Sequence, residues 1–434
     1  MENPKIRFKG FTKDWEQRKL GELVKEGILE APLDGNHGEK HPTSDEYVDS
    51  GIPFLMASDI HNGEVNIYSC KYITKERAER LDKGFARNGD VLLTHKATIG
   101  ETAILSNLMT EYAMLTPQVT YYRIKNEERL NREYLYSFFN SLDFQTELKT
   151  KAAQSTRPYI GITAQQNLKI ILPAEIDEQI RIGLYFRNLD HLITLHQRKC
   201  DQTKNLKKYM LQKMFPQNGA KVPEIRFDGY TYDWEQRKLG EVLISLQNNT
   251  LSRADLSNET GIAKNVHYGD VLIKFGDVLD VSREQLPMIK DEKILDKYKA
   301  SFLQNGDVII ADTAEDTTVG KCSEIAGLRD EVVLSGLHTI PYRPVEKFAT
   351  GYLGYYLNAS AYHDQLIPLM QGIKVTSISK YAMQDTDIVY PKSIEEQAMI
   401  GSYFQSLDHL ITLHQRKCDE LKKMKKYMLQ NMFI

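Results

Sequence analysis

Two clusters of basic residues, at matching positions in two repeated segments, are the side chains best suited to bind an anionic partner. Residues 198–213 hold six Lys and Arg against one acid, and residues 416–426 hold six against two. A single cluster is usually a solvated helix face, but recurrence indicates a shared role, either phosphate contact or contact with a partner subunit. The basic residues are Arg198, Lys199, Lys204, Lys207, Lys208, Lys213, Arg416, Lys417, Lys422, Lys423, Lys425 and Lys426.

The chain carries no sequence motif of a catalytic or metal site. The string nearest to a phosphate-binding loop, Thr317 to Cys322 (TTVGKC), lacks the upstream glycine and the following hydroxyl residue. There is no HExxH or paired CxxC motif, and no glycine-rich dinucleotide turn follows a predicted strand. No catalytic residue, no metal and no cofactor bound by this chain is therefore expected, which favours a recognition protein over an enzyme.

These residues sit in a sequence that contains the same two blocks twice. Residues 4–24 return as residues 223–243 with 15 of 21 positions identical, and residues 189–215 return as residues 407–433 with 22 of 27 identical. The segments between these blocks scarcely resemble each other. A frame repeated around two divergent inserts predicts one scaffold that presents two different binding surfaces.

Each repeat predicts a mixed α/β insert followed by a long helix. Both inserts place a short β-like run after an Asn-Gly-Asp turn, carry a later helix-like aromatic stretch, and end in a strand at Pro173 or Pro391. The predicted divisions are an opening segment (1–24), a first insert (25–172), a central long helix (173–216), a linker with the repeated opening segment (217–243), a second insert (244–390) and a C-terminal long helix (391–434).

Both long helices show a heptad-like apolar seam. The seam residues step by 3, 4, 3 and 4, and no proline interrupts residues 177–215, so each helix would be on the order of 55–60 Å long. We expect the two helices to form an antiparallel coiled coil with pseudo-twofold symmetry in an α+β protein. The seam residues are Phe186, Leu189, Ile193, His196, Cys200, Phe404, Leu407, Ile411, His414 and Cys418.

Composition is ordinary for a folded protein. With 41% apolar and 26% charged residues and a net charge of −3, the chain of 434 residues is not a nonspecific coat for nucleic acid, although local basic clusters leave specific DNA binding open. No apolar run approaches the length of a membrane span, and the N-terminus carries no secretory signal. Four cysteines without a CxxC pair predict reduced thiols and a cytoplasmic protein that does not engage membranes.

The repeated blocks resemble one known family, the specificity subunits of type I restriction-modification systems. The resemblance rests on the paired DWEQRKLGE segments, the paired Asn-Gly-Asp turns and the paired closing blocks, residues 171–193 and 389–411. It covers essentially the whole chain, and two closing blocks, each after an insert of about 150 residues, make it specific.

The resemblance implies a function and a set of partners. Such subunits carry two target-recognition domains, each of which contacts one half of an asymmetric, bipartite site in double-stranded DNA, and the helices set the spacer between the halves. Two modification subunits dock on this frame and methylate adenine with S-adenosylmethionine. Two restriction subunits complete a complex that cleaves DNA using ATP and Mg. The specificity subunit itself supplies no catalytic residues.

Under this resemblance, polar loop residues of both inserts are the candidates for DNA contact. In the first insert they are Asn36, His37, His41, Thr94, His95, Lys96, Thr98, Gln154, Ser155, Thr156 and Arg157, the last four lying where family members carry a polar loop that faces DNA. In the second insert they are Asn248, Asn249, Arg253, Thr313, Thr317, Gln371, Lys374 and Thr376. Asp312, Glu315 and Asp316 stand where the first insert has His95 and Lys96, and because acids repel phosphates we expect that loop to lie away from DNA.

Two alternatives remain at this point. The chain could be a coiled-coil adaptor whose inserts bind something other than DNA, or an autonomous DNA-binding protein. The second alternative predicts tight sequence-specific binding by the isolated chain, whereas the family resemblance predicts assembly with a modification subunit.

Overall fold

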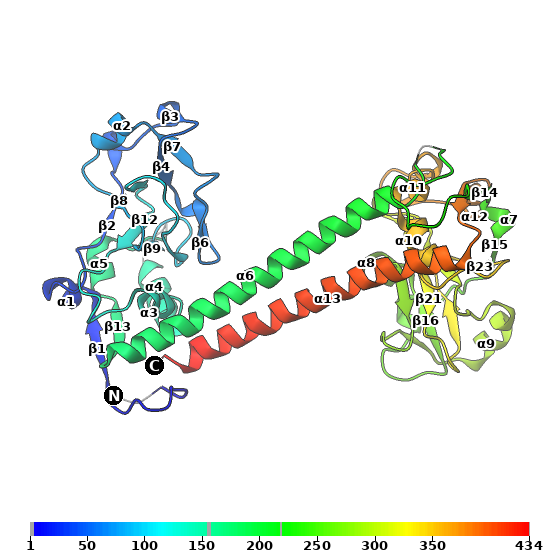
Figure 1. Cartoon of the computed structure of the whole chain (residues 1–434). Helices are drawn as coiled ribbons and strands as arrows, with labels where there is room; N and C mark the ends of the chain where they lie inside the picture. The colour runs from blue at the N-terminus through cyan, green and yellow to red at the C-terminus, as the bar shows by residue number, and fades with distance from the viewer. Residues whose placement is uncertain (1–3, 154–157, 218, 434) are drawn as a thin grey trace. The chain divides into compact units, whose positions relative to one another are not determined.

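The computed structural model describes residues 4–153, 158–217 and 219–433. Contacts divide the chain into two compact units: unit 1 comprises residues 1–197 and 415–434, and unit 2 comprises residues 198–414. Each unit is mixed α/β, and each includes part of the two long helices, α6 (Ile176–Lys213) and α13 (Ile394–Asn431) (Figure 1). No helix within the described ranges is long and apolar enough to cross a membrane.

Unit 1 is built on two sheets and an antiparallel ribbon. In the ribbon, β1 (Trp15–Lys19) pairs with β13 (Lys169–Pro173), so the opening segment lies against the strand that leads into α6. The four-stranded sheet has the order β10 (Thr102–Ile104), β9 (Val91–Thr94), β12 (Val119–Tyr122) and β2 (Leu33–Asp34). The five-stranded sheet has the order β3 (Tyr47–Val48), β7 (Lys71–Ile73), β4 (Ile52–Leu55), β11 (Ala113–Leu115) and β8 (Phe85–Ala86).

The described part of unit 1 also contains a small hairpin and five short α-helices. The hairpin consists of β5 (Ile60–His61) and β6 (Glu64–Val65). The helices are α1 (Leu20–Lys25), α2 (Lys75–Glu79), α3 (Arg132–Phe139), α4 (Leu142–Ala152) and α5 (Ile162–Gln166).

The core of unit 1 is aromatic and is completed by both long helices. Tyr134 and Phe138 of α3 lie against Phe433, which follows α13, with ring centroids 5.8 Å apart in both cases. Phe186 of α6 stacks on the same Phe433 at 5.7 Å. Because large rings bury much apolar area, this cluster joins the sheet, α3 and the two helix segments into one core.

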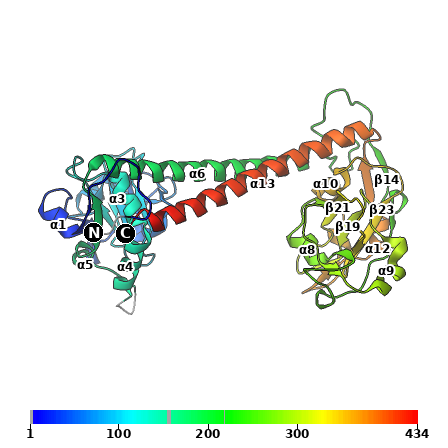
Figure 2. The ribbon, with the colours of Figure 1, turned by 90° about the horizontal axis from the view of Figure 1, so that it is seen from below.

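Unit 2 repeats the central strands but arranges the rest differently. A ribbon of β14 (Glu235–Lys238) and β25 (Asp387–Tyr390) again leads into the long helix. Figure 2 shows β21, β19 and β23 as neighbours in the main sheet. That sheet has the order β15 (Leu243–Ser245), β23 (Thr339–Pro344), β19 (Val308–Ala311), β21 (Cys322–Ala326) and β17 (Val278–Asp280). The second sheet has only three strands, β18 (Met288–Ile289), β16 (Ala263–Val266) and β22 (Val333–Ser335).

Short elements complete unit 2. A two-stranded pair joins β20 (Thr313–Ala314) to β24 (Thr376–Ser377). The helices are α7 (Leu239–Val242), α8 (Tyr268–Ile273), α9 (Glu292–Tyr298), α10 (Tyr352–Asn358), α11 (Ser360–His363) and α12 (Lys380–Gln384). Phe215, Phe404 and the rings of α10 form a core equivalent to that of unit 1, with Phe215 and Phe404 stacked at 5.8 Å.

The predicted Asn-Gly-Asp turns precede equivalent strands in the two units. We call the sheets that contain these strands the main sheets: the four-stranded sheet of unit 1 and the five-stranded sheet of unit 2. Gly89 and Gly306 have φ values of +98° and +91°, a region that favours glycine, and the buried strands β9 and β19 begin one residue after the Asp. Arg123 donates to Asp90 at 2.9 and 2.7 Å, and Arg343 donates to Asp307 at 3.0 and 2.7 Å. The Asp therefore anchors each turn to the neighbouring strand.

The predicted α+β fold with two similar domains and two long helices is confirmed. The aromatic stretches form α3 and α10, and the strands that end at the prolines form the ribbons with the opening segments. The pseudo-twofold symmetry of the helix pair stays a prediction, but the ring contacts of Phe186 with Phe433 and of Phe404 with Phe215 are equivalent and show antiparallel packing within each unit.

Candidate nucleic-acid interface

A buried ion pair fixes the opening segment of each unit to the first turn of its long helix. Glu178 of α6 accepts hydrogen bonds from Arg7 at 2.7 and 2.8 Å and from the Trp15 indole at 3.2 Å. In unit 2, Glu396 accepts from Arg226 at 2.7 and 2.9 Å and from Trp234 at 3.2 Å. Each long helix therefore begins with one carboxylate that is 1% exposed and holds the opening segment through direct hydrogen bonds.

Six of the ten predicted seam residues are buried. Ile193, His196, Ile411 and His414 are half-buried, while the others are at most 6% exposed. Cys418 lies 4.0 Å from the Ile193 carbonyl within unit 1, and Cys200 lies 3.8 Å from the Ile411 carbonyl within unit 2. All four cysteines are buried.

Two of the basic residues proposed for phosphate or partner contact belong instead to half-buried ion pairs. Lys207 contacts Asp408 at 2.5 Å and Asp277 at 2.7 Å, and Lys425 contacts Asp190 at 2.5 Å. Lys213 also pairs, with Glu224. The remaining members of both clusters are exposed, so only these residues are accessible for the predicted contact with phosphates or a partner subunit.

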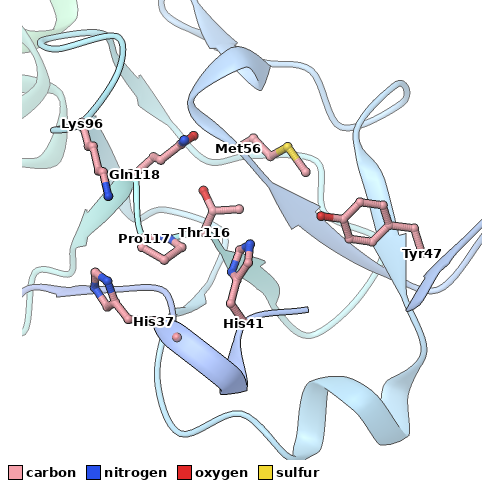
Figure 3. Close-up of a pocket in the computed structure, with 9 residues that line it drawn as sticks. His37, His41, Tyr47, Met56, Lys96, Thr116, Pro117 and Gln118 are labelled. Carbon is pink, nitrogen blue, oxygen red and sulfur yellow. The ribbon is translucent and has the colours of Figure 1, made fainter. Parts of the chain in front are cut away.

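In unit 1, three of the predicted contact residues surround one cavity of about 440 Å³. Lys96 follows β9, while His37 and His41 flank a short turn after β2. Figure 3 shows these three side chains around Thr116 and Pro117, with Gln118, Tyr47 and Met56 on the other walls. The rim therefore offers a lysine, two imidazoles and a carboxamide, which suit acceptor atoms on phosphates or purine edges.

Behind this cavity lies a buried carboxylate. Asp34 is 2% exposed, pairs with Lys83, and contacts His37 Nε2 at 2.8 Å. Burial raises the pKa of Asp34, but the hydrogen bonds from Lys83 and His37 outweigh burial and leave that pKa below its ordinary value. His37 is thereby oriented at the cavity by a group that stays ionised.

Several predicted contact residues of unit 1 lie inside the fold. Asn36 is 4% exposed, donates to the Lys83 carbonyl at 2.8 Å and accepts from the Asp82 amide at 3.2 Å. Thr94 and His95 are fully buried, and the His95 Nδ1 lies 3.0 Å from the Ile160 carbonyl. Thr98 is exposed. The chain segment with Gln154, Ser155, Thr156 and Arg157 lies outside the described residues.

Unit 2 has a cavity of about 390 Å³ at the corresponding edge of its main sheet. Thr339, Ile340 and Pro341 of β23 line this cavity, together with Gln247 and Asn248. Asp312, Ser379 and Lys380 also line it. This rim contains a carboxylate, which the rim in unit 1 lacks.

The other predicted residues of unit 2 divide between interior and surface. Asn249 is fully buried and donates to Asn265 at 2.7 Å and to the Ser335 carbonyl at 2.9 Å. Arg253 is paired with Asp270 at 2.5 and 3.1 Å. Thr313 and Thr376 are half-buried on the paired strands β20 and β24, and Thr317, Gln371 and Lys374 are exposed.

The loop that carries Lys374 also contains two exposed aliphatic residues that were not among the predicted contact residues. Gln371 and Ser377 exchange backbone hydrogen bonds of 2.9 and 2.8 Å and close a hairpin. Within it, Ile373 is fully exposed and Val375 is 56% exposed. The sequence alternates apolar and polar residues from 373 to 376. Exposed apolar residues that lie together on a loop can mark a binding surface.

The described residues contain no cluster of three or more His, Cys, Asp or Glu side chains that could hold a metal ion. In both units, polar and cationic side chains line a cavity beside the main sheet. Such a surface can donate and accept hydrogen bonds, as readers of nucleic-acid edges do.

Comparison with known proteins identifies the family of this chain. The family model described as the type I restriction modification DNA specificity domain matches residues 12–205 and again residues 232–423. The type I restriction enzyme MjaVIII specificity subunit of Methanocaldococcus jannaschii is 23% identical over 430 residues, which cover 96% of this chain and 91% of that protein. The MjaIX specificity subunit of the same organism is 24% identical over 245 residues, 53% of this chain and 52% of that protein.

A solved structure shows the same fold. The S subunit of a type I restriction-modification system from M. genitalium aligns over 100% of this chain and 99% of its own length, with a TM-score of 0.60 at 12% identity. Since the family model covers most of the sequence in two successive copies, this chain belongs to the family of type I restriction modification DNA specificity domains.

Proposed function

We propose that this chain is the DNA-recognition subunit of a type I restriction-modification complex and supplies no catalytic residue of its own. The observation that carries the proposal is the pairing of a repeated frame with two cavities of different polar composition. One cavity rim has Lys96 and two histidines, and the other has Asp312 and Lys380. Each unit would contact one half of an asymmetric bipartite site in double-stranded DNA.

The long helices would dock the modification subunits. Each unit exposes four apolar helix residues at repeat-equivalent positions, all between 37% and 57% exposed. They are Leu192, Leu195, Met424 and Tyr427 in unit 1, and Leu206, Tyr209, Leu410 and Leu413 in unit 2. Exposed apolar sets of this kind favour a protein partner, and one set per unit favours two copies of it.

Cofactors then belong to the partners. The modification subunits would methylate adenine with S-adenosylmethionine, and two restriction subunits would use ATP and Mg to cleave unmethylated DNA, in the cytoplasm. The helices α6 and α13, each of which contributes to both units, would set the number of unread base pairs between the half-sites.

Genome-wide mapping of adenine methylation tests the proposal. The chain is co-expressed with its modification subunit in a methylation-free host, and long-read sequencing records modified adenines. We expect a split motif with two unequal halves methylated on opposite strands. Exchange of residues 25–172 for the insert of another family member should change one half only; a change in both halves would contradict independent recognition.

Two results favour the alternatives. A soluble complex with the modification subunit that methylates no motif favours a coiled-coil adaptor. Tight, sequence-specific binding by the isolated chain, without any effect of the modification subunit, favours an autonomous DNA-binding protein.

A further inference from the structure

The residue that follows β9 in unit 1 and the residue that follows β19 in unit 2 make equivalent backbone hydrogen bonds. Their side chains differ. In unit 1, the His95 amide donates to the Gln118 carbonyl at 2.9 Å, and its carbonyl accepts from Ile160 at 3.2 Å. In unit 2, the Asp312 amide donates to the His338 carbonyl at 3.1 Å, and its carbonyl accepts from Ile378 at 2.9 Å. The two inserts thus hold this backbone position in the same way but place different side chains on it.

The two side chains point to different surroundings. His95 is fully buried, with Nδ1 against the Ile160 carbonyl, so it contributes to the interior. Asp312 lines the cavity of unit 2, and its side chain is 26% exposed. The same position is therefore structural in unit 1 and faces the candidate interface in unit 2.

The Asp312 carboxylate is fixed through one oxygen. Oδ1 accepts a hydrogen bond from the Thr313 hydroxyl at 2.7 Å and lies 3.4 Å from His338 Nδ1. Among the residues that the structure describes, none donates to Oδ2. An acceptor whose backbone and first oxygen are both held, and whose second oxygen remains open at a cavity, is oriented before any ligand arrives.

A carboxylate at a DNA surface discriminates between the hydrogen-bond donors and acceptors of the DNA. It repels phosphates, and it also repels the acceptor atoms of guanine and thymine in the major groove. The groups that can donate to it there are the exocyclic amino groups of cytosine and adenine. Lys380 on the same rim offers the cation that a flanking phosphate requires.

We propose that Asp312 is a specificity-determining residue of unit 2, which accepts a hydrogen bond through Oδ2 from the exocyclic amino group of a base, N4 of cytosine or N6 of adenine. The assignment rests on the proposed function and differs from the expectation that acids keep this loop away from DNA. His95, its counterpart in unit 1, makes no such contact, so the two half-sites are selected by different chemistry at one shared position.

Methylation mapping of variants in the complex with the modification subunit tests the assignment. Asp312→Ala should lose roughly tenfold discrimination at one base pair of one half-site, with all other positions unchanged. Asp312→Asn, which keeps the shape and an acceptor, should alter preference at that same base pair and serves if the alanine variant does not fold. Asp296→Asn, an exposed acid of α9 in the same unit, is the matched control and should leave the motif intact.

Base analogues separate the two donors. Duplexes in which purine replaces adenine, or 2-pyrimidinone replaces cytosine, lack only the amino group. The wild-type complex should bind the relevant analogue about as poorly as Asp312→Ala binds normal DNA, and the variant should not distinguish the two duplexes. A clear wild-type motif that Asp312→Ala and Asp312→Asn leave unaltered would overturn the Asp312 assignment alone, whereas a wild-type complex without any motif would overturn the proposed function as well.

Discussion

Units 1 and 2 share the main contacts that hold their frames and differ in their inserts. The Arg-Glu-Trp contact, the Asn-Gly-Asp turn with its arginine, and the stacked phenylalanines of the helix pair recur with nearly equal distances. The second sheet, by contrast, has five strands in unit 1 and three in unit 2. The two units thus keep the contacts that position each insert, whereas the inserts themselves differ in structure.

The difference extends into the core. Ile104 of β10 pairs with Val91 in unit 1, and Glu324 of β21 pairs with the equivalent Val308 in unit 2. Glu324 is 1% exposed and accepts from the Gly351 and Gly354 amides at 2.6 and 3.0 Å. One unit thus has a half-buried hydrocarbon side chain where the other buries an ionisable group that holds the start of α10.

The largest expected effect tests the equivalence of the frames. Glu178→Ala and Glu396→Ala each leave an arginine without its buried partner, so we expect each to destabilise its own unit by about 3 kcal/mol. Peptide-resolved hydrogen exchange in urea measures the two units separately. Glu16→Ala, which removes an exposed ion-pair partner, should cost no more than about 0.5 kcal/mol. Clearly unequal losses for the two buried glutamates would show that the frames are not equivalent.

A second prediction sharpens the difference between the cores. Burial raises the pKa of Glu324 to about 7, even though backbone amides act to lower it. Because an unfolded glutamate titrates near pH 4.3, the protonated form stabilises the fold: unit 2 should be most stable below about pH 4.3 and lose stability as the pH rises toward 7. Glu324→Gln should remove this dependence and make unit 2 more stable at pH 8, by up to roughly 3 kcal/mol.

The measurement is urea unfolding at several pH values between 4.5 and 8, followed by a deuterium pulse at one fixed pH. Peptides of unit 1, which has Ile104 at the equivalent position, provide the internal control. Persistence of the pH dependence of unit 2 in the Glu324→Gln variant would assign it to another group.

The smallest expected effect compares the two cavities. Lys96→Ala and Lys380→Ala each remove one cation from a rim, and each should weaken DNA binding and reduce the slope of log affinity against log salt by about one. Neither should change the methylated motif, because phosphate contacts carry no sequence information. Binding of the complex to a cognate duplex at several salt concentrations measures both slopes. A changed motif would mean that the lysine contacts a base.

The sequence was sufficient for the fold and only partly for the site. Repetition identified two units, and proline-marked strands, glycine turns and apolar periodicity predicted the main elements, because these patterns act locally. The seam pattern could not reveal that Phe215 and Phe433 complete the cores, since their role depends on long-range packing. Loop composition likewise could not separate Asn36 and Asn249, which satisfy interior backbone groups, from His37 and Asn248 at the cavities.

The division of the chain also bears on how the protein is made. Unit 2 is one continuous stretch, residues 198–414, whereas unit 1 needs residues 415–433 to finish its core around Phe433 and to pair Ile6 with Asn431. A chain emerging from the ribosome therefore has every residue of its second unit before its first unit is complete. The aromatic core of unit 1 stays uncovered until residues 415–433 have been made. A nascent chain that stops near residue 414 would therefore carry a complete second unit and an incomplete first unit with exposed aromatic surface.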